Sequence, residues 1–299
     1  EHVQMLMELV QGGGGTISRS PNPDPDQPPI PIVPYDLEQA CEDVFIPRDS
    51  IAGIIDRLTR KLNVVLQGPP GVGKTYVARR LAWLLMEEKD DSRIGLVQFH
   101  QSMGYEDFVQ GFRPQVGSAG FRRKDGAFLD FCRRASQDPG RKYVFIIDEI
   151  NRGNISKIFG ELLMLIEHDK RSSRYAARLA LHEDGEVPFH VPQNVHIIGL
   201  MNTADRSLAV VDHALRRRFS FIDIDPAFGQ PELQTWLERY WEDEVAEAID
   251  LRLQELNRAI AADHDLGRGF RVGHSHFCDQ QPTLRQNWDD YRTIIESDI

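Results

Sequence analysis

The feature that most constrains the fold is the stretch GPPGVGKT at residues 68–75, which fits the pattern G-x-x-x-x-G-K-[ST] without a mismatch. It follows a short apolar run, NVVLQ at residues 63–67, and precedes an amphipathic helical stretch from Val77 to Met86. Glycines at such a turn let backbone N–H groups point inward around phosphates, and the helix N-terminus adds its positive potential. This order of strand, loop and helix predicts a phosphate-binding loop at the end of a buried strand.

Every residue of this loop is a candidate nucleotide ligand: Gly68, Pro69, Pro70, Gly71, Val72, Gly73, Lys74 and Thr75. Lys74 is expected to reach the β- and γ-phosphates, and the Thr75 hydroxyl is expected to bind Mg²⁺. The alternative is a glycine- and proline-rich turn without a ligand. The strand before the loop and the helix after it favour the phosphate-binding interpretation.

A second element, YVFIIDE at residues 143–149, places two carboxylates directly after a run of apolar residues. Asp148, at the end of this strand, is expected to bind Mg²⁺, and Glu149 to act as general base for the attacking water. Acidic pairs also occur at solvated strand ends without any catalytic role. Together with the upstream phosphate loop, however, the pair predicts a nucleotide-hydrolysing site.

Five short apolar runs alternate with helical stretches, at residues 63–67, 95–100, 143–148, 195–201 and 219–224. Continuous apolar runs are typical of parallel strands buried on both faces. Their alternation with helices predicts right-handed crossovers and a doubly wound α/β core. Residues 155–166 are expected to form one helix, because the spacing of one helix face is followed by Ile155, Ile158, Phe159, Leu162 and Ile166.

The chain is expected to have three parts. Residues 1–34 contain a tail and a Gly/Pro-rich linker, and residues 35–228 contain the α/β nucleotide-binding domain. Residues 229–299 form a small all-helical subdomain, because the strand pattern stops near Pro231 and residues 232–262 predict two helices. A further helix is expected to begin near Trp288.

Composition narrows the class of protein. The formal net charge of −11 argues against a surface broadly covered in nucleic-acid-binding charge, although a local basic patch remains compatible with it. The three cysteines lie far apart and suggest neither a disulfide framework nor a zinc site, which favours a reduced, cytoplasmic setting. No apolar run approaches the ~20 residues of a membrane span, so no membrane partner is expected. Because the chain begins with Glu1, we expect an N-terminally trimmed fragment.

The stretch MNTADRSLAVVDHALRRRFSF at residues 201–221 has two conflicting features. Asn202 and Asp205 show the Asn-x-x-Asp spacing with which small G proteins bind a guanine base. Arg216, Arg217 and Arg218 directly precede an aromatic strand, which is where an oligomeric ATPase would place an arginine that acts on its neighbour. The stretch therefore points either to the base or to the reacting phosphate.

These motifs together resemble the AAA+ ATPase superfamily and, more narrowly, the McrB family of GTP-hydrolysing motor subunits in modification-dependent restriction systems. The resemblance runs from about Glu42 to Ile299 and includes stretches that most AAA+ proteins do not share. They are LQGPPGVGKTYVARRLA, VQFHQSMGYEDFVQGFRP, FRRKDGAF, IIDEINRGNISKIFGELLMLIEHDKR and IIGLMNTADRSLAVVDHALRRRFSFIDI. The resemblance implies a five-stranded parallel sheet flanked by helices and followed by an all-helical lid subdomain.

The resemblance also resolves the conflict in residues 201–221. In AAA+ proteins the strand that ends at the position of Asn202 lies between the phosphate-loop strand and the acidic-pair strand. Asn202 is therefore expected to face the γ-phosphate and the catalytic water, as sensor I, and the G-protein-like spacing is coincidental. A base-side role for residues 202–205 stays open as the alternative. Asp205 is expected to place the water or to hold Arg206.

Further site residues follow from the same resemblance. Arg217 and Arg218 are expected to reach into the neighbouring subunit's site, where a cation neutralises charge that develops in the transition state. A solvated basic turn is the alternative. Asn151 joins the catalytic candidates and Thr203 the nucleotide ligands.

Two regions outside the phosphate site complete the expected contacts. In GRGFRVGHSHF, at residues 267–277, the lid residues Arg271 and His274 are expected to reach the phosphates. Val44, Phe45 and Ile46, upstream of the first strand, are candidates for the base pocket. The aromatics Phe99, Tyr105, Phe108 and Phe112 could line a pore or a partner surface, with core packing expected for at least two of them. The basic residues 122–124 either meet nucleic acid or lie at a solvated hairpin tip.

The resemblance implies a GTP-hydrolysing ring motor, expected to be a homohexamer, that drives translocation on double-stranded DNA and activates an McrC-like nuclease subunit. Double-stranded DNA would be contacted through the ring pore and through a DNA-reading domain that precedes the linker in this family. Two other functions stay open: an ATP-dependent protein remodeller of the MoxR type, and an assembly module whose hydrolysis only times ring disassembly. No single residue dictates guanine over adenine.

Overall fold

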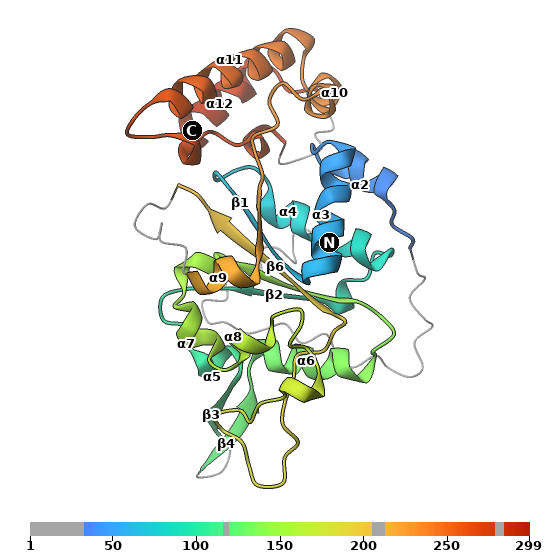
Figure 1. Ribbon diagram of the computed structural model, residues 1–299. Coiled ribbons are helices and arrows are strands. Elements are labelled where there is room, and N and C mark those ends of the chain that lie inside the picture. Colours follow the sequence, from blue (N-terminus) through green and yellow to red (C-terminus); the bar gives the residue numbers. More distant parts are fainter. Residues whose placement is uncertain (1–32, 116–119, 205–212, 279–283) are drawn as a thin grey trace. The chain divides into compact units, whose positions relative to one another are not determined.

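The computed structural model describes residues 33–115, 120–204, 213–278 and 284–299 (Figure 1). Its centre is a five-stranded parallel sheet in the order β2-β5-β6-β1-β7. The strands are β1 (Asn63–Gly68), β2 (Ile94–Gln98), β5 (Tyr143–Asp148), β6 (Val195–Asn202) and β7 (Ser220–Asp223). All five lie within about two residues of their predicted positions, and β6 separates the phosphate-loop strand from the acidic-pair strand, as predicted.

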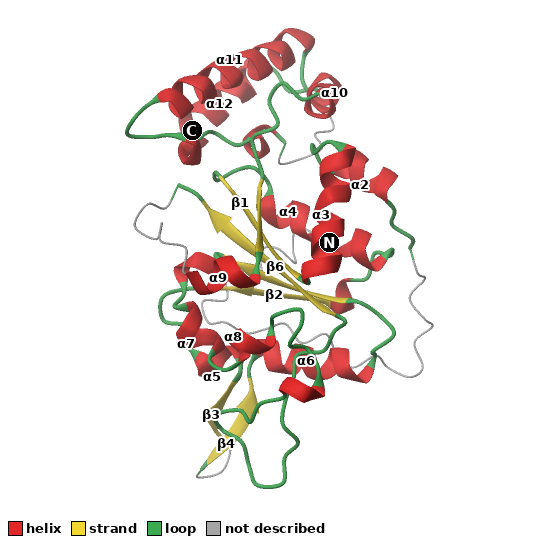
Figure 2. Ribbon diagram, in the orientation of Figure 1, coloured by secondary structure: helices red, strands yellow, loops and turns green. Residues whose placement is uncertain are grey.

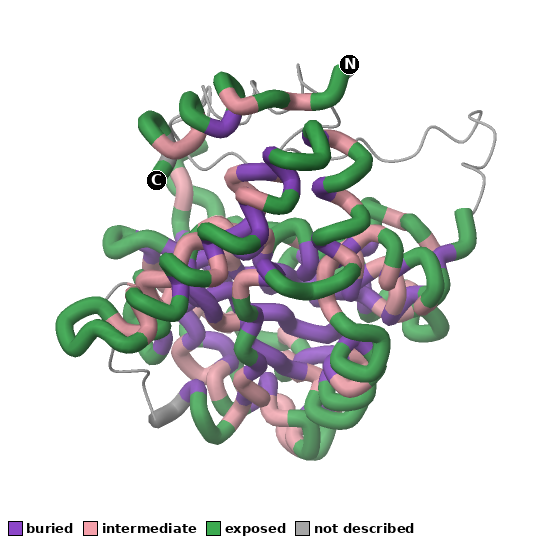
Figure 3. The backbone as a smooth tube through the Cα atoms, turned by 90° about the horizontal axis from the view of Figure 1, so that it is seen from above, coloured by how far each residue is buried: buried purple, intermediate pink, exposed green. Residues whose placement is uncertain are grey.

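Helices cover both faces of this sheet (Figure 2). They are α2 (Leu37–Asp43), α3 (Arg48–Lys61), α4 (Lys74–Met86), α5 (Tyr105–Phe108), α6 (Ala127–Gln137), α7 (Ile155–Phe159), α8 (Leu162–Leu165) and α9 (His213–Arg218). Alternate residues of one strand belong to two separate apolar clusters. On β5, Val144 and Ile146 pack with α3 and α4, whereas Phe145 and Ile147 pack with the cluster that contains α5 to α8. Figure 3 shows the buried positions concentrated in the strands and on the inward sides of the helices.

The prediction of one helix over residues 155–166 is wrong. The chain forms α7 and α8 with a break at Gly160, whose φ of 51° lies in the left-handed region. A Cβ atom at this position would lie 2.9 Å from the Tyr105 ring. The apolar face is nevertheless correctly predicted, because all five of its residues are buried against the sheet.

A second sheet, absent from the predicted strands, pairs β3 (Gln110–Pro114) with β4 (Phe121–Asp125) as an antiparallel hairpin. The basic residues 122–124 lie within β4, and not at the tip of the hairpin. Arg123 is only 15% exposed and forms an ion pair with Glu186. Its role is therefore to attach the hairpin to the loop around residue 186.

The C-terminal helices have an apolar core of their own. They are α10 (Pro231–Tyr240), α11 (Asp243–Ala262) and α12 (Trp288–Asp298), as predicted. Trp241 is fully buried among them, and the buried Asp250 carboxylate accepts hydrogen bonds from Gly229 N, Gln234 Nε2 and Gln254 Nε2. In the part of the chain that the structure describes, no helix is both long and apolar enough to cross a membrane.

Candidate active site

The candidate active site lies at the carboxyl ends of β1, β5 and β6, where three loops meet. Gly68 at the end of β1 is paired in register with Asn202 at the end of β6, and β5 ends on the other side of β6 at Asp148. Parallel strands place their carboxyl ends at one edge of the sheet, where α/β proteins bind their ligands. The topology thus brings together residues that are up to 134 positions apart (202 − 68 = 134).

The phosphate loop has the backbone shape that its glycines allow. Gly71 and Gly73 have φ values of 75° and 70°, a region that residues with a Cβ atom rarely adopt. Gly73 is the N-cap of α4, so the first N–H groups of this helix point into the loop. The loop therefore offers N–H donors to an anion, as predicted.

Lys74, the first residue of α4, carries a positive charge that is almost fully buried. Its Nζ donates hydrogen bonds to Gly68 O (3.1 Å) and Pro69 O (2.8 Å). Burial lowers the pKa of Lys74 to about 8, although the carboxylates of Glu149 and Asp148 act in the opposite direction. The ammonium group thus faces the loop with less solvation than it would have in water, which favours its binding to a strong anion.

Asp148 and Glu149 share one short turn. The Glu149 N–H donates to Asp148 Oδ1 at 3.0 Å, and burial raises the pKa of Asp148 above its usual value. Glu149 has a φ of 52°, which is uncommon for a residue with a side chain and costs about 1 kcal/mol or more. This backbone conformation turns the Glu149 carboxylate toward β6.

The Glu149 carboxylate is held from two sides. Asn202 Nδ2 donates to Glu149 Oε1 at 2.6 Å, and Arg152 Nε lies 3.2 Å from Glu149 Oε2. The first contact joins the predicted general base to the predicted sensor residue. Arg152 is missing from the predicted site, although its position three residues after Glu149 could have indicated a contact across a single turn.

The other predicted residues of this region differ in their contacts and in their burial. Thr203 N–H donates to Gly68 O at 3.1 Å, which attaches the chain after β6 to the start of the phosphate loop. Asn151 is half-buried in the turn after Glu149. Asp205 lies outside the described residues, so its role stays a prediction.

Oxygen donors suited to Mg²⁺ are present in this group. Thr75 supplies a hydroxyl at the start of α4 and Asp148 a carboxylate at the end of β5. Mg²⁺ binds oxygen ligands and usually keeps several water molecules, so one or two protein ligands suffice. Among the described residues, no group of three or more His, Cys, Asp and Glu side chains is placed to hold a metal ion.

The lid meets the phosphate loop through residues other than those predicted. Ser275 N–H donates to Gly71 O at 2.8 Å, and the His276 ring lies so close that a Cβ atom on Gly71 would come within 2.6 Å of Nε2. Arg271 instead forms an ion pair with Asp225.

His274 has its hydrogen-bonding partner away from the loop. Its Nδ1 accepts the Ala227 N–H at 3.1 Å, and its ring packs against Phe45 at 5.3 Å. Burial lowers the pKa of His274 to about 4, so the ring is neutral near pH 7. Contact of His274 with the phosphates therefore stays a prediction, with Nδ1 already engaged by Ala227.

The three predicted base-pocket residues are not equivalent. Val44 is 4% exposed and packs in the core with α3 and α4. Phe45 and Ile46 line a cavity of about 480 Å³ together with residues 221–227. Phe45 and Ile46 therefore stay candidates, whereas Val44 supports them from the core.

The three arginines end α9, directly before β7 and at the opposite edge of the sheet from Lys74. Arg218 is 14% exposed, and its Nη2 lies 2.9 Å from Glu167 Oε1. Arg217 is exposed. Action on a neighbouring subunit stays a prediction for both residues, and Arg218 has a partner within its own chain.

The phosphate loop follows β1, the acidic pair follows β5, and the polar Asn202 ends β6 between them. This arrangement defines a P-loop nucleoside triphosphatase. The chain belongs to the AAA domain family, dynein-related subfamily, whose model matches residues 63–219. Residues 248–299 match the model of the McrB alpha-helical lid domain. The predicted fold class and the resemblance to the McrB family are both confirmed.

Two relatives come from bacterial restriction enzymes. The EcoKMcrB subunit of a type IV methyl-directed restriction enzyme from Escherichia coli strain K12 is 57% identical over 246 residues, which cover 82% of this chain and 53% of the relative. Component YdiS of the type II restriction enzyme BsuMI from Bacillus subtilis strain 168 is 24% identical, and the match covers 64% of each chain. The chain thus spans about half the length of the first relative.

Proposed function

We propose that this chain is the GTP-hydrolysing motor part of a modification-dependent restriction system. The observation that carries the proposal is the 2.6 Å contact between Asn202 and Glu149, because it supports their joint action as the proposed sensor and the proposed base. The names of the relatives, a methyl-directed restriction subunit and a restriction-enzyme component, support the biological setting.

In this proposal Lys74 binds the β- and γ-phosphates and the loop N–H groups surround them. Thr75 and Asp148 would hold Mg²⁺, which neutralises phosphate charge when it is bound. Glu149 accepts a proton from the attacking water as that water adds to the γ-phosphorus. The bond from this phosphorus to the β–γ bridging oxygen breaks, so that GDP and inorganic phosphate leave, and Asn202 orients the Glu149 carboxylate. Arg152 forms an ion pair with the second carboxylate oxygen of Glu149 and helps to orient the base.

The ring assembly belongs to the same proposal. An exposed Arg217 at the end of α9 would reach the γ-phosphate bound to the next copy in a homohexameric ring. Such rings would translocate double-stranded DNA and activate an McrC-like nuclease subunit.

We place the boundary of the lid subdomain near residue 228, because the apolar cluster of the C-terminal helices begins at Ala227.

Calorimetric titration of GTP and of ATP, each with Mg²⁺, tests the choice of nucleotide. We expect GTP to bind at least about tenfold more tightly. The Glu149→Gln variant serves as the titrated protein, since it would keep nucleotide from being hydrolysed during the measurement. Tighter ATP binding, with no effect of DNA on turnover, would instead support the MoxR-type remodeller.

A further inference from the structure

A buried polar pair lies at the amino end of β1, far from the phosphate loop. Asn63 is 0% exposed and Arg171 is 2% exposed. Arg171 Nη2 donates to Asn63 Oδ1 at 2.5 Å, Nε donates to Ile166 O at 3.0 Å, and Nη1 donates to Val195 O. A buried guanidinium is tolerated only when its donors are matched, and here each nitrogen of the group has an acceptor.

The same pair reaches the arginine helix. Asn63 Nδ2 donates to Ile166 O at 2.8 Å and to Arg218 O at 3.1 Å, which is the last carbonyl group of α9. The Arg218 side chain then pairs with Glu167, the residue that follows Ile166. Both the backbone and the side chain of Arg218 are thus attached to one small region.

The short α9 needs such an attachment. It has six residues, and isolated helices of that length are not stable in water. Leu215 in its middle is buried in the core, and the direction of the exposed side chains of its last turn depends in addition on what fixes its carboxyl end. At the carboxyl end these contacts come from Asn63 and Glu167, with Arg171 holding Asn63 in place.

We propose that Asn63, Glu167 and Arg171 are positioning residues that fix the last turn of α9 and thereby aim Arg217 at the nucleotide of a neighbouring copy. Arg218 serves as the anchor within its own chain and not as a second acting arginine. The inference rests on the proposed function, because it requires hydrolysis that one copy completes for another.

The test measures the kcat of GTP hydrolysis, the Kd for GTP and the recovery of activity in mixtures with Glu149→Gln subunits. Glu167→Gln removes the charge and keeps the shape. We expect its kcat to fall at least about tenfold with an unchanged Kd, as for loss of a partly buried ion pair. Mixing should restore activity, because a Glu149→Gln subunit still supplies an intact α9 to its neighbour.

The control is Arg133→Gln, which removes the 2.9 Å ion pair between Arg133 on α6 and Asp125 on β4, two elements that carry none of the residues in this proposal. Its kcat should equal that of the parent. The exchanged pair Glu167→Arg/Arg218→Glu should recover part of the kcat that either single change loses, because the attraction is restored with reversed charges.

The outcomes separate this inference from the proposed function. If Arg217→Ala is not complemented by Glu149→Gln subunits, action on a neighbouring copy is wrong, and the proposed ring mechanism fails with it. If Arg217→Ala is complemented but Glu167→Gln keeps the parent kcat, only the positioning role is wrong. A Glu167→Gln protein that loses GTP affinity, or that mixing does not restore, would also overturn the positioning role.

Discussion

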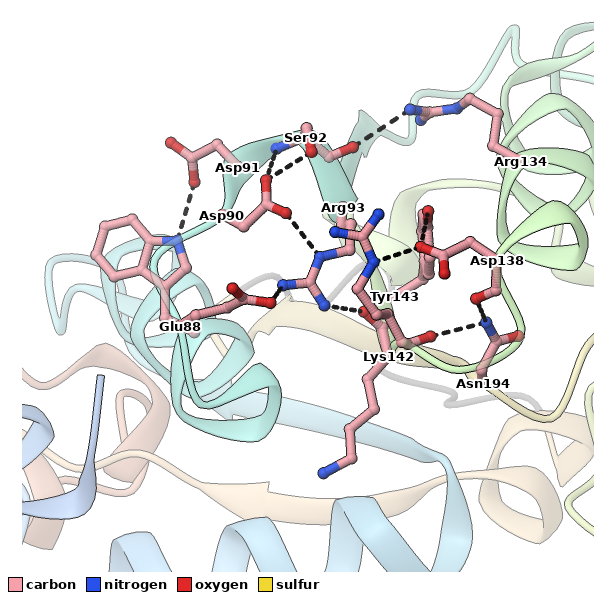
Figure 4. Close-up of polar contacts among 12 residues, drawn as sticks. Glu88, Asp90, Asp91, Ser92, Arg93, Arg134, Asp138, Lys142, Tyr143 and Asn194 are labelled. Carbon is pink, nitrogen blue, oxygen red and sulfur yellow. Dashed lines mark hydrogen bonds and ion pairs between the residues drawn. The ribbon is translucent and has the colours of Figure 1, made fainter. Parts of the chain in front are cut away.

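The central sheet has an amino edge and a carboxyl edge, formed by the amino and the carboxyl ends of its parallel strands. Buried charges have different surroundings at these two edges. At the amino ends of the strands, Arg93 donates to Asp90 (2.7 Å) and Lys142 O (3.1 Å) and pairs with Glu88 (Figure 4). At the same edge, Asn194 Nδ2 lies 2.8 to 3.0 Å from three carbonyl oxygens. Buried polar groups with matched partners of this kind hold a structure together.

At the carboxyl edge the charges are matched less completely. Lys74 has two carbonyl acceptors and a pKa lowered to about 8, and Asp148 has a pKa raised by burial. Groups with perturbed pKa values in a loop-lined site are candidates for function. Burial alone thus does not distinguish Lys74 from Arg93, whereas the smaller number of partners makes Lys74 the candidate for function.

The largest effect is expected from Glu149→Gln. The amide keeps the contact with Asn202 but cannot accept a proton, so kcat for GTP hydrolysis should fall about a thousandfold, with GTP binding retained. Phosphate release measured at saturating GTP gives the result. Glu186→Gln, which removes the same charge at the hairpin, is the control. Hydrolysis by Glu149→Gln at the parent rate would mean that Glu149 is not the base.

Arg93→Met tests the amino edge. The Arg93 side chain is 3% exposed, and its loss leaves the carboxylates of Glu88 and Asp90 without their cationic partner. The free energy of unfolding should fall by about 3 kcal/mol in urea titrations followed by circular dichroism. Arg60→Met, at an exposed ion pair, should change it by about 0.5 kcal/mol or less. If both variants lost the same free energy of unfolding, the buried ion pairs of Arg93 would contribute no more to stability than the exposed ion pair of Arg60.

Lys74→Met should act in the opposite direction on stability. Removing a charge that burial disfavours is expected to raise the free energy of unfolding by about 1 kcal/mol. GTP affinity should fall about thirtyfold, because a charge-assisted contact contributes roughly 2 kcal/mol. Calorimetry and urea titration on the same protein give both values. A loss of stability as large as that of Arg93→Met would show that the two edges do not differ.

The smallest effect concerns pH. Because the pKa of Lys74 is lowered to about 8 and phosphate binding favours its charged form, GTP binding above pH 8 must take up a proton. Affinity should therefore decrease about tenfold between pH 7 and pH 9, and this dependence should be absent in Lys74→Met. Proton uptake is measured by calorimetry in buffers of different ionisation enthalpy. An affinity that rises with pH would contradict the assignment.

Local sequence patterns predicted much of the site. The phosphate loop, Asp148 and Glu149 were found because glycines and strand-ending carboxylates act through neighbouring residues of the chain. Asn202 required the order of the strands, which came from the resemblance and is confirmed.

Local sequence patterns did not predict the features that involve residues far apart in the chain. Gly160, where the helix breaks, lies close to the Tyr105 ring, and the pairing of Asn63 with Arg171 joins residues 108 positions apart. The hairpin strands QGFRP and FRRKD lack the apolar alternation from which a strand is predicted. The positive φ of Glu149 was also missed, because no residue type at that position indicates it.

The approach of Gly273 to Gly71 has a mechanical consequence. A Cβ atom on Gly273 would lie 2.0 Å from the Gly71 carbonyl group, so the two backbones touch where any side chain would hold them apart. A hinge that swings the lid away must break this contact and the Ser275 hydrogen bond at once. Force applied to the lid would thus be transmitted directly to residues 68–75, the proposed phosphate loop, because backbone contacts backbone there.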